Sequence, residues 1–131
     1  GYEGVRIKDI LQMSSGVKFN EDYADPKSDI NIFGRAVARG SSFRDFSKTL
    51  EREKTPGTYH HYVSIDTQVL GFLLAEVTGV SVQDYLYEKI WNKIGMEQGA
   101  YYITDNLGVE MALGGLMMEI GWVNRLFQQS G

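Results

Sequence analysis

Hydrophobic residues recur at spacings of three and four along most of the chain, which is the pattern of helices with one buried face. Short stretches rich in Gly, Pro, Asn and Asp separate these segments. The spacing predicts helices over residues 7–11, 30–40, 42–50, 64–78, 81–95 and 116–127. The segments 64–78 and 81–95 carry the widest apolar faces, so they are expected to form the core.

Polar residues that can cap a helix stand at the start of several of these segments. Asp29, Ser42, Ser64 and Ser81 are predicted N-caps, because their side-chain oxygens can accept a hydrogen bond from an unpaired backbone N–H. Ser42 followed by Asp45 resembles a capping box, with Asp in place of the usual Glu. Both ends of most predicted helices are therefore marked in the sequence.

Strand signals are confined to one place. The segments 101–103 and 109–112 have β-propensity, and the turn residues 105–108 separate them, which predicts a small hairpin. A single hairpin cannot organise a sheet by itself. The expected fold class is mostly α, a single multi-helix domain over residues 1–131 with a minor β-hairpin.

Composition narrows the possible partners. The net charge is −4 and basic residues alternate with acidic ones, so nucleic-acid binding is not expected. The apolar run 69–77 is interrupted and far shorter than the roughly 20 residues of a membrane span. No signal peptide is predicted at the start, and the compartment stays open. Without cysteine, the chain has no disulfide, thiolate zinc site or Cys nucleophile.

Tyr62 is the residue most suited to chemistry. With Ser64 as an N-cap, Tyr62 lies just outside a helix N-terminus, where the partial positive charge favours a phenolate that could act as a general base. The alternative is structural, in which Tyr59 and Tyr62 pack their rings against the core and leave their hydroxyls in water. Isolated tyrosines beside helices are common, so the residues alone favour the packing role.

Three other groups of residues invite a functional interpretation. Ser15-Gly16-Val17-Lys18 reads Ser-x-x-Lys, a spacing that shares one helical face, but Gly16 stands where a helix ends. His60 and His61 are adjacent and point in different directions, which does not suit a metal site. Asp22, Asp25 and Asp29 lack the spacing of a calcium loop and are expected to cap turns. No metal site is predicted.

Several motifs, in order along nearly the whole chain, carry a resemblance to a known family. They are Ile7-Lys8-Asp9-Ile10-Leu11-Gln12-Met13-Ser14-Ser15-Gly16, Tyr62-x-Ser64 with Ile65-Asp66-Thr67-Gln68-Val69-Leu70-Gly71, Glu76-Val77-Thr78-Gly79-Val80-Ser81, Asp84-Tyr85-Leu86, Lys89-Ile90-Trp91, Ile94-Gly95-Met96, and Asp105 with Gly108, Glu110, Ala112 and Gly114-Gly115-Leu116. This series resembles the penicillin-recognising serine hydrolases, the superfamily of class C β-lactamases, D-Ala-D-Ala peptidases, family VIII esterases and nylon-oligomer hydrolases. Gly121-Trp122 departs from the Arg-Asp pair that usually follows, whereas Arg125-Leu126-Phe127 resembles what comes next.

The resemblance implies roles for two residues. Tyr62 falls on the tyrosine that helps shuttle the nucleophile's proton, and Ser64 falls on the Asn or Ser that lines the substrate cleft. In the family the nucleophile belongs to a Ser-x-x-Lys motif and a Lys/His-x-Gly strand faces the substrate carboxylate. These two motifs normally lie before and after the stretch that this sequence covers. The chemistry uses neither metal nor organic cofactor.

Two functions follow from this comparison. The first is the helical-domain portion of a serine hydrolase that acts on small ester or amide substrates through an acyl-enzyme, inactive as an isolated chain. The second is a non-catalytic helical binding or self-assembly module derived from that family. Under either hypothesis an exposed apolar face is expected to contact the remainder of the hydrolase or a second copy of the chain.

Overall fold

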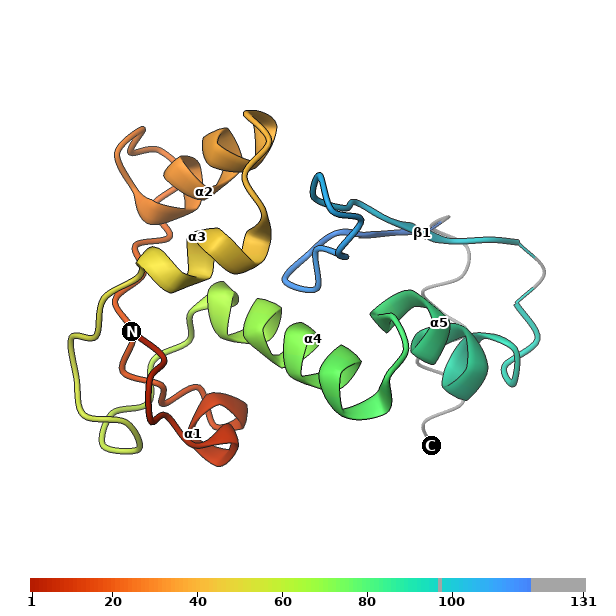
Figure 1. Ribbon diagram of the computed structural model, residues 1–131, viewed down its shortest axis with the longest axis horizontal. Coiled ribbons are helices and arrows are strands. Elements are labelled where there is room, and N and C mark those ends of the chain that lie inside the picture. Colours follow the sequence, from red (N-terminus) through yellow and green to blue (C-terminus); the bar gives the residue numbers. More distant parts are fainter. Residues whose placement is uncertain (97, 119–131) are drawn as a thin grey trace.

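The structure is a computed structural model and describes residues 1–96 and 98–118. Its elements, in chain order, are α1 (Ile7–Leu11), α2 (Asp29–Ala38), α3 (Phe43–Thr49), α4 (Ser64–Thr78), α5 (Val82–Leu86), a π-helical turn (Tyr87–Trp91) that continues α5, β1 (Tyr101–Tyr102) and β2 (Leu116–Met117) (Figure 1). The described part is mostly helical with one small antiparallel sheet, as the sequence predicts.

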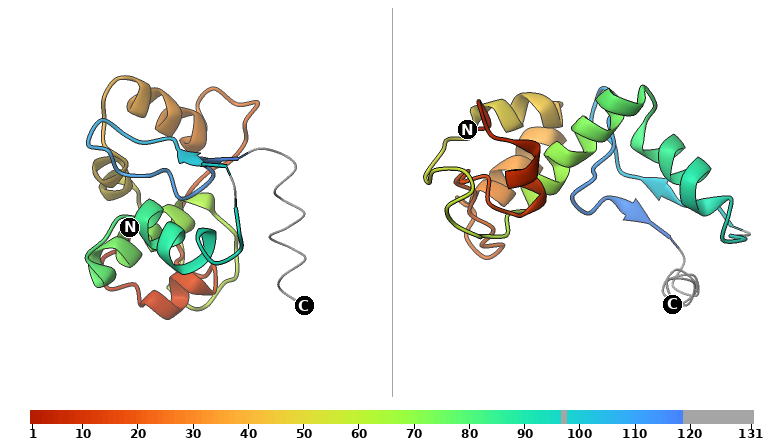
Figure 2. Two further views of the ribbon diagram at one scale, coloured as in Figure 1. Left: turned by 90° about the vertical axis from the view of Figure 1, so that its right-hand side faces the viewer. Right: turned by 90° about the horizontal axis from the view of Figure 1, so that it is seen from below.

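Helix α4 is the axis of the molecule. Helices α1, α2 and α3 gather around its N-terminal half, and α5 with the β1–β2 pair lies toward its C-terminal end (Figures 1 and 2). Gly79 ends α4 in the left-handed conformation, with φ of 72°, as expected for a helix C-terminus. Among the described residues no single helix is both long and apolar enough to cross a membrane, and the one pair that passes on length and composition, α4 with α5 and its π-helical turn, is bent by 78°.

The hydrophobic core lies between α2, α3 and the first half of α4. Phe33 is at its centre, with its ring stacked on Phe43 at 5.4 Å between centroids and edge-on to Phe46 at 5.1 Å. Such aromatic pairs stabilise a core beyond the area they bury. The buried hydrophobic residues of this cluster are Val17, Phe19, Ile30, Phe33, Phe43, Phe46, Leu50, Val63, Ile65 and Phe72.

The predicted core is correct for the first half of α4 and wrong for α5. Ile65 and Phe72 of α4 are buried, but Val77, on the same predicted stripe, is 81% exposed, and α5 has no buried residue. Only Trp91, in the turn that follows α5, is buried in that part of the chain. Helical spacing identifies an apolar face, but the face is buried only where another element covers it. Here α1 and α3 pack against the first half of α4, and α2 packs on α3 (Figure 1).

The predicted N-caps differ in outcome. The Ser42 and Ser81 side chains each accept a hydrogen bond of 3.0 Å from the backbone N–H three residues later, as predicted. Asp29 is the first residue of α2 rather than its N-cap, a position that Ser28 occupies. The Asp29 carboxylate instead accepts a hydrogen bond of 2.7 Å from the backbone N–H of Asn20, which closes the preceding loop.

The predicted turn at residues 105–108 is present, but the strand that pairs with β1 is not the predicted one. The Asp105 N–H donates to the Val109 carbonyl at 3.0 Å, and Thr104 and Glu110 form an isolated antiparallel bridge. The strand that pairs with β1 is β2, with Tyr102 opposite Leu116. Residues 109–111 pair with 103–105 as the predicted hairpin requires, since the Met111 N–H also donates to the Ile103 carbonyl at 2.8 Å, but they form an isolated bridge and not a strand. The chain then turns at 112–114 before β2 begins.

The last predicted helix, over 116–127, is wrong at its start, because Leu116 and Met117 form β2. Gly115 precedes this strand and packs against Met111, where an added Cβ would meet the Met111 Cβ at 2.6 Å. The chain therefore needs a glycine at this close approach. Residues 119–127, including Gly121-Trp122 and Arg125-Leu126-Phe127, lie outside the described residues.

Candidate functional site

Tyr62 lies in the extended segment that leads into α4, one residue before the N-cap Val63. Its side chain is 53% exposed, and that of Tyr59 is exposed to a similar degree with its ring stacked on His61 at 5.9 Å. Neither tyrosine is packed into the hydrophobic core. The Tyr62 ring is therefore accessible at the mouth of α4, and a reacting group could approach it there.

The backbone around Tyr62 is tied to the segment that follows α1. The His61 N–H donates to the Met13 carbonyl at 2.8 Å, and the Gly57 N–H donates to the Ser14 carbonyl at 2.8 Å. The loop that carries Tyr62 is thus held at two points by residues far away in sequence. Such long-range backbone hydrogen bonds fix the position of an otherwise irregular segment.

Ser64 is the first residue of α4 and not its N-cap, because Val63 takes that position. Its side chain is only 6% exposed. Its backbone N–H donates to Oε1 of Glu21 at 2.6 Å, and its hydroxyl donates to the same oxygen. Tyr62 and Ser64 therefore differ in their surroundings, because the tyrosine side chain is exposed to solvent and the serine side chain is buried and hydrogen-bonded to Glu21.

Glu21 is a residue of this site that the sequence analysis missed. It lies in the loop before α2, 43 residues before Ser64, and no local pattern links the two positions. The Val63 side chain has no acceptor, so the Glu21 carboxylate takes the place of an N-cap at α4. A carboxylate at this end of a helix also interacts favourably with the helix dipole.

A second carboxylate lies beneath the first turn of α4. Asp66 is fully buried, and its Oδ1 accepts a hydrogen bond of 2.6 Å from the Tyr2 hydroxyl, while Oδ2 has no partner among the described residues. Burial raises the pKa of Asp66 above its ordinary value, and the neighbouring hydroxyls of Tyr2 and Ser15 oppose that change. Burial, together with the neighbouring Asp66, raises the pKa of Tyr2.

Gln68 is the third buried polar residue of α4, and its contacts are structural. Its Nε2 donates to the Glu110 carbonyl at 2.9 Å, and the Glu110 side chain accepts a hydrogen bond of 3.1 Å from the backbone N–H of Gln83 at the start of α5. These bonds join α4, the loop before β2 and α5. A buried amide is tolerated because its polar atoms are paired.

The Ser-x-x-Lys sequence at residues 15–18 does not form a nucleophile site. Ser15 is buried and lies outside any helix, and Gly16 has φ of 73°. Val17 bridges to Arg52 in extended conformation, so Ser15 and Lys18 do not share a helical face. A Cβ on Gly16 would meet the Lys54 carbonyl oxygen at 2.2 Å, so this turn requires glycine. As the position of Gly16 predicts, no helix begins at Ser15.

Within residues 1–96 and 98–118, no three His, Asp or Glu side chains come together as a possible metal site. The loop aspartates bind backbone groups instead. Asp22 accepts from the Ala24 N–H at 2.9 Å and Asp25 accepts from the Lys27 N–H at 2.8 Å. They therefore stabilise turns, which is the role that their spacing predicts.

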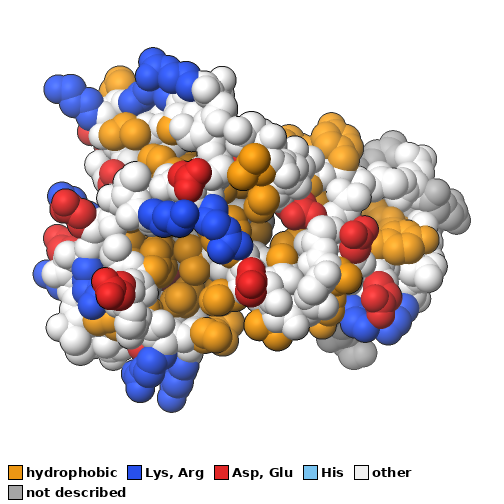
Figure 3. Space-filling view, viewed as in Figure 1, with side chains coloured by type: hydrophobic (Ala, Val, Ile, Leu, Met, Phe, Trp, Pro, Cys, Tyr) orange, Lys and Arg blue, Asp and Glu red, His pale blue; other side chains and the backbone are white. Residues whose placement is uncertain are grey.

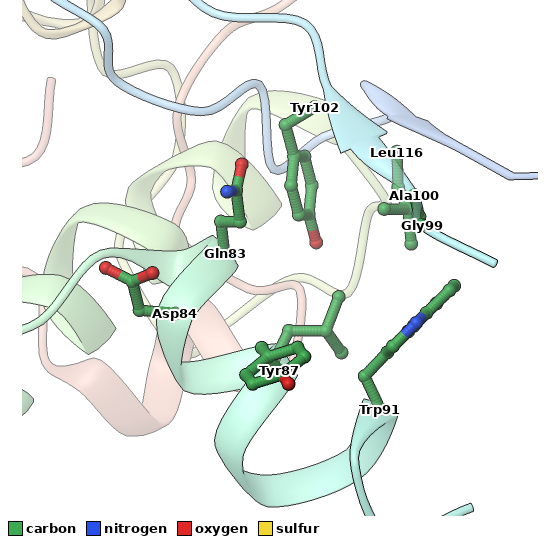
Figure 4. A pocket seen from close by; sticks show the side chains of 9 residues that line it. Gln83, Asp84, Tyr87, Trp91, Gly99, Ala100, Tyr102 and Leu116 are labelled. Carbon is green, nitrogen blue, oxygen red and sulfur yellow. The ribbon is translucent and has the colours of Figure 1, made fainter. Parts of the chain in front are cut away.

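A groove at the other end of the molecule is separate from Tyr62. It lies between α5 with its π-helical turn and the β1–β2 pair, and the Tyr102 and Trp91 side chains point into it from opposite sides (Figure 4). The Trp91 Nε1–H donates to the Gln98 carbonyl at 3.1 Å, which fixes the ring. The lining residues are Gln83, Asp84, Leu86, Tyr87, Trp91, Gly99, Ala100, Tyr102 and Leu116.

The sequence matches a family model and several known proteins. The family model described as Beta-lactamase matches residues 1–106. The 6-aminohexanoate-dimer hydrolase of Paenarthrobacter ureafaciens is 29% identical over 122 residues, which is 88% of this chain and 31% of that protein. A putative D-alanyl-D-alanine carboxypeptidase of Escherichia coli K12 is 30% identical over 102 residues, or 73% of this chain and 21% of that protein.

A solved structure has the same fold over this segment. The putative 6-aminohexanoate-dimer hydrolase from Bacillus anthracis matches with a TM-score of 0.80 and 23% identity. The match covers 96% of this chain and 36% of that protein. The chain thus spans about one third or less of the length of the proteins it resembles.

Proposed function

The chain belongs to the beta-lactamase family, and on this basis we propose that it is the helical-domain portion of a serine hydrolase. The proposed reaction is hydrolysis of an ester or amide through an acyl-enzyme. In the first step a serine oxygen bonds to the substrate carbonyl carbon, the bond to the leaving group breaks, and the serine proton passes to that group. In the second step water releases the acid and restores the serine.

The observation that carries this proposal is the accessible Tyr62 at the mouth of α4, inside the segment that matches the family. We assign its hydroxyl to proton transfer between the nucleophile and the leaving group. The surrounding hydrogen bonds hold the Tyr62 loop in place, which supports such a role because proton transfer requires a fixed donor–acceptor geometry. Ser64, at the first position of α4, is assigned to the wall of the substrate cleft.

The isolated chain is expected to be inactive. Ser15 is buried outside a helix, and no second serine is paired with a lysine in a Ser-x-x-Lys spacing within the described residues. The relatives are named for 6-aminohexanoate dimer and D-alanyl-D-alanine. We take from these names only the shared class, a small acyl substrate with a scissile amide or ester.

The test uses intact mass spectrometry. Residues 1–131, incubated with a p-nitrophenyl ester or a chromogenic cephalosporin, should give no acyl adduct. The full-length product of the reading frame that contains this segment should give one, on a serine of a Ser-x-x-Lys motif. A stable adduct on Ser15 of the 131-residue chain, or no adduct and no turnover with the full-length protein, would contradict the proposal.

The second candidate is a non-catalytic helical module that binds the rest of a larger protein or a second copy of itself. Its support is apolar surface over α3 and α4, where Tyr2, Val69 and Phe72 line a shallow groove and hydrophobic side chains reach the surface (Figure 3). Sedimentation of residues 1–131 tests it. A concentration-dependent dimer together with a full-length protein that forms no acyl adduct would favour this candidate over the hydrolase.

A further inference from the structure

Hydrogen bonds fix the backbone on both sides of Glu21. Asn20, its neighbour, accepts a hydrogen bond of 2.9 Å from the Asp22 N–H through its side chain and one of 3.1 Å from the Ile30 N–H through its carbonyl. The Asn20 N–H donates to Asp29 in the first turn of α2. The backbone that carries Glu21 is therefore fixed to the start of α2, and Glu21 reaches from there to the start of α4.

The hydrogen bonds from Ser64 to Glu21 determine what Ser64 can still bind. A hydroxyl group has one hydrogen to donate and two lone pairs to accept with. The Ser64 hydrogen is directed at Glu21 Oε1, and the Ser64 backbone N–H is directed at the same oxygen. The donors of Ser64 are therefore both used inside the protein, and only its lone pairs are available to another group.

We propose that Glu21 is a positioning residue that fixes Ser64 as a hydrogen-bond acceptor, so that the cleft recognises a substrate N–H rather than a carbonyl oxygen at this point. The inference rests on the proposed function, in which Ser64 lines the cleft. It deepens that function by assigning a preference for amides over esters, because an ester has no N–H to donate. The Glu21 carboxylate accepts from both donors of Ser64 and so keeps the hydroxyl hydrogen from turning toward the substrate.

The first experiment tests the hydrogen bonds on residues 1–131. In hydrogen exchange followed by NMR, Glu21→Ala should speed exchange of the Ser64 amide by about tenfold or more, because the N–H loses its partner. Glu21→Gln should keep most of the protection, since its side-chain oxygen still accepts. Glu53→Gln, an exposed carboxylate elsewhere, serves as the control. Unchanged Ser64 exchange in Glu21→Ala would overturn the proposal.

The second experiment measures substrate preference in the full-length protein. The readout is the ratio of kcat/KM for an amide and an ester of the same acyl group. Glu21→Ala should lower this ratio by about tenfold. Without Glu21 the Ser64 hydroxyl can turn and donate to a carbonyl oxygen, which amides and esters both have, so the preference for a substrate N–H is lost. Glu21→Gln should restore it to within about twofold of the wild type. A general loss of stability would lower both rates and leave the ratio unchanged.

A double substitution shows whether Glu21 acts through Ser64. Ser64→Ala should lower the amide-to-ester ratio by itself, and adding Glu21→Ala should change the ratio no further. Independent effects of the two substitutions, or a ratio that neither substitution changes, would overturn the proposal. A wild-type protein that hydrolyses neither substrate contradicts the proposed hydrolase function and with it the substrate preference, whereas the Ser64 exchange measurement still decides whether Glu21 positions this residue.

Discussion

The Tyr2 hydroxyl donates a hydrogen bond of 2.6 Å to the buried Asp66 carboxylate, 64 residues further along the chain. This contact joins the N-terminal segment to the first turn of α4. A buried carboxylate is costly unless it is hydrogen-bonded, and the other oxygen of Asp66 has no partner among the described residues. The stability of the start of α4 therefore depends on Tyr2.

Tyr2→Phe removes the hydroxyl and leaves the ring in place. We expect the free energy of unfolding to fall by about 1–3 kcal/mol, because Asp66 then loses its hydrogen bond while it stays buried. Urea denaturation of residues 1–131 measures this change. Tyr101→Phe, at an exposed position of β1, is the matched control and should leave the midpoint unchanged. Equal midpoints for Tyr2→Phe and the wild type would show that the hydrogen bond does not stabilise the fold.

Asp66 should make stability depend on pH in the acid range. Its pKa is raised in the folded protein, so the folded state holds the proton at pH values where the unfolded state has already lost it. This contribution to stability is complete below the unfolded pKa, which is about 3.9 for Asp, and it is lost as pH rises through the folded pKa.

Asp66→Asn removes that titration while keeping an oxygen that can accept from Tyr2. The difference in unfolding free energy between wild type and Asp66→Asn should shift in favour of the variant as pH rises from 3.5 through the acid range. Denaturation series at closely spaced pH values measure it. A difference that is constant with pH, or one that shifts toward the wild type, would contradict the raised pKa.

The aromatic cluster should dominate stability. Phe33→Ala removes the ring that stacks on Phe43 and meets Phe46 edge-on, so we expect a loss of about 3–5 kcal/mol. Val77→Ala, on the exposed end of α4, should change stability by less than about 0.5 kcal/mol. Thermal denaturation compares the two variants. A larger effect at Val77 than at Phe33 would mean that the core lies along α4 and α5, as helical spacing alone suggested.

The sequence predicted features that neighbouring residues decide. The caps at Ser42 and Ser81 are correct because a cap depends on a side chain and a backbone N–H three residues away. The glycine that ends α4 is correct for the same reason. The caps predicted at Asp29 and Ser64 are wrong because these side chains bond to distant residues instead. The pairing of β1 with β2 was missed because turn residues in the sequence indicate that the chain reverses but not which later segment pairs.

The candidate site was predicted only in part for a related reason. The proposed role of Tyr62 comes from its place before a helix and from the ordered motifs of the family, and it stays a prediction. Glu21 could not be predicted, because an acidic residue in a polar loop is usually solvated, and its contact with Ser64 forms only when the loop before α2 folds against the start of α4. The burial of Asp66 was not predicted for a similar reason, since acidic residues in a first helical turn are ordinarily exposed.

Tyr62→Phe tests the proposed proton transfer in the full-length protein. The substitution keeps the exposed ring and removes only the hydroxyl, so the free energy of unfolding should change little. Proton transfer by a positioned side chain contributes about 10²- to 10⁴-fold to the rate, and kcat for ester hydrolysis should fall within that range. KM should change much less, because the role assigned to the hydroxyl belongs to the transition state.

Tyr59→Phe is the matched control for this last prediction, since Tyr59 lies three residues earlier in the same loop and is equally exposed. Its kcat should stay within about twofold of the wild type, because a hydroxyl outside the reacting groups adds nothing to the transition state. If both variants lose the same fraction of activity, the loop and not the Tyr62 hydroxyl is responsible. If Tyr62→Phe keeps full activity, the proton must pass through another group, and the role assigned to Tyr62 is wrong.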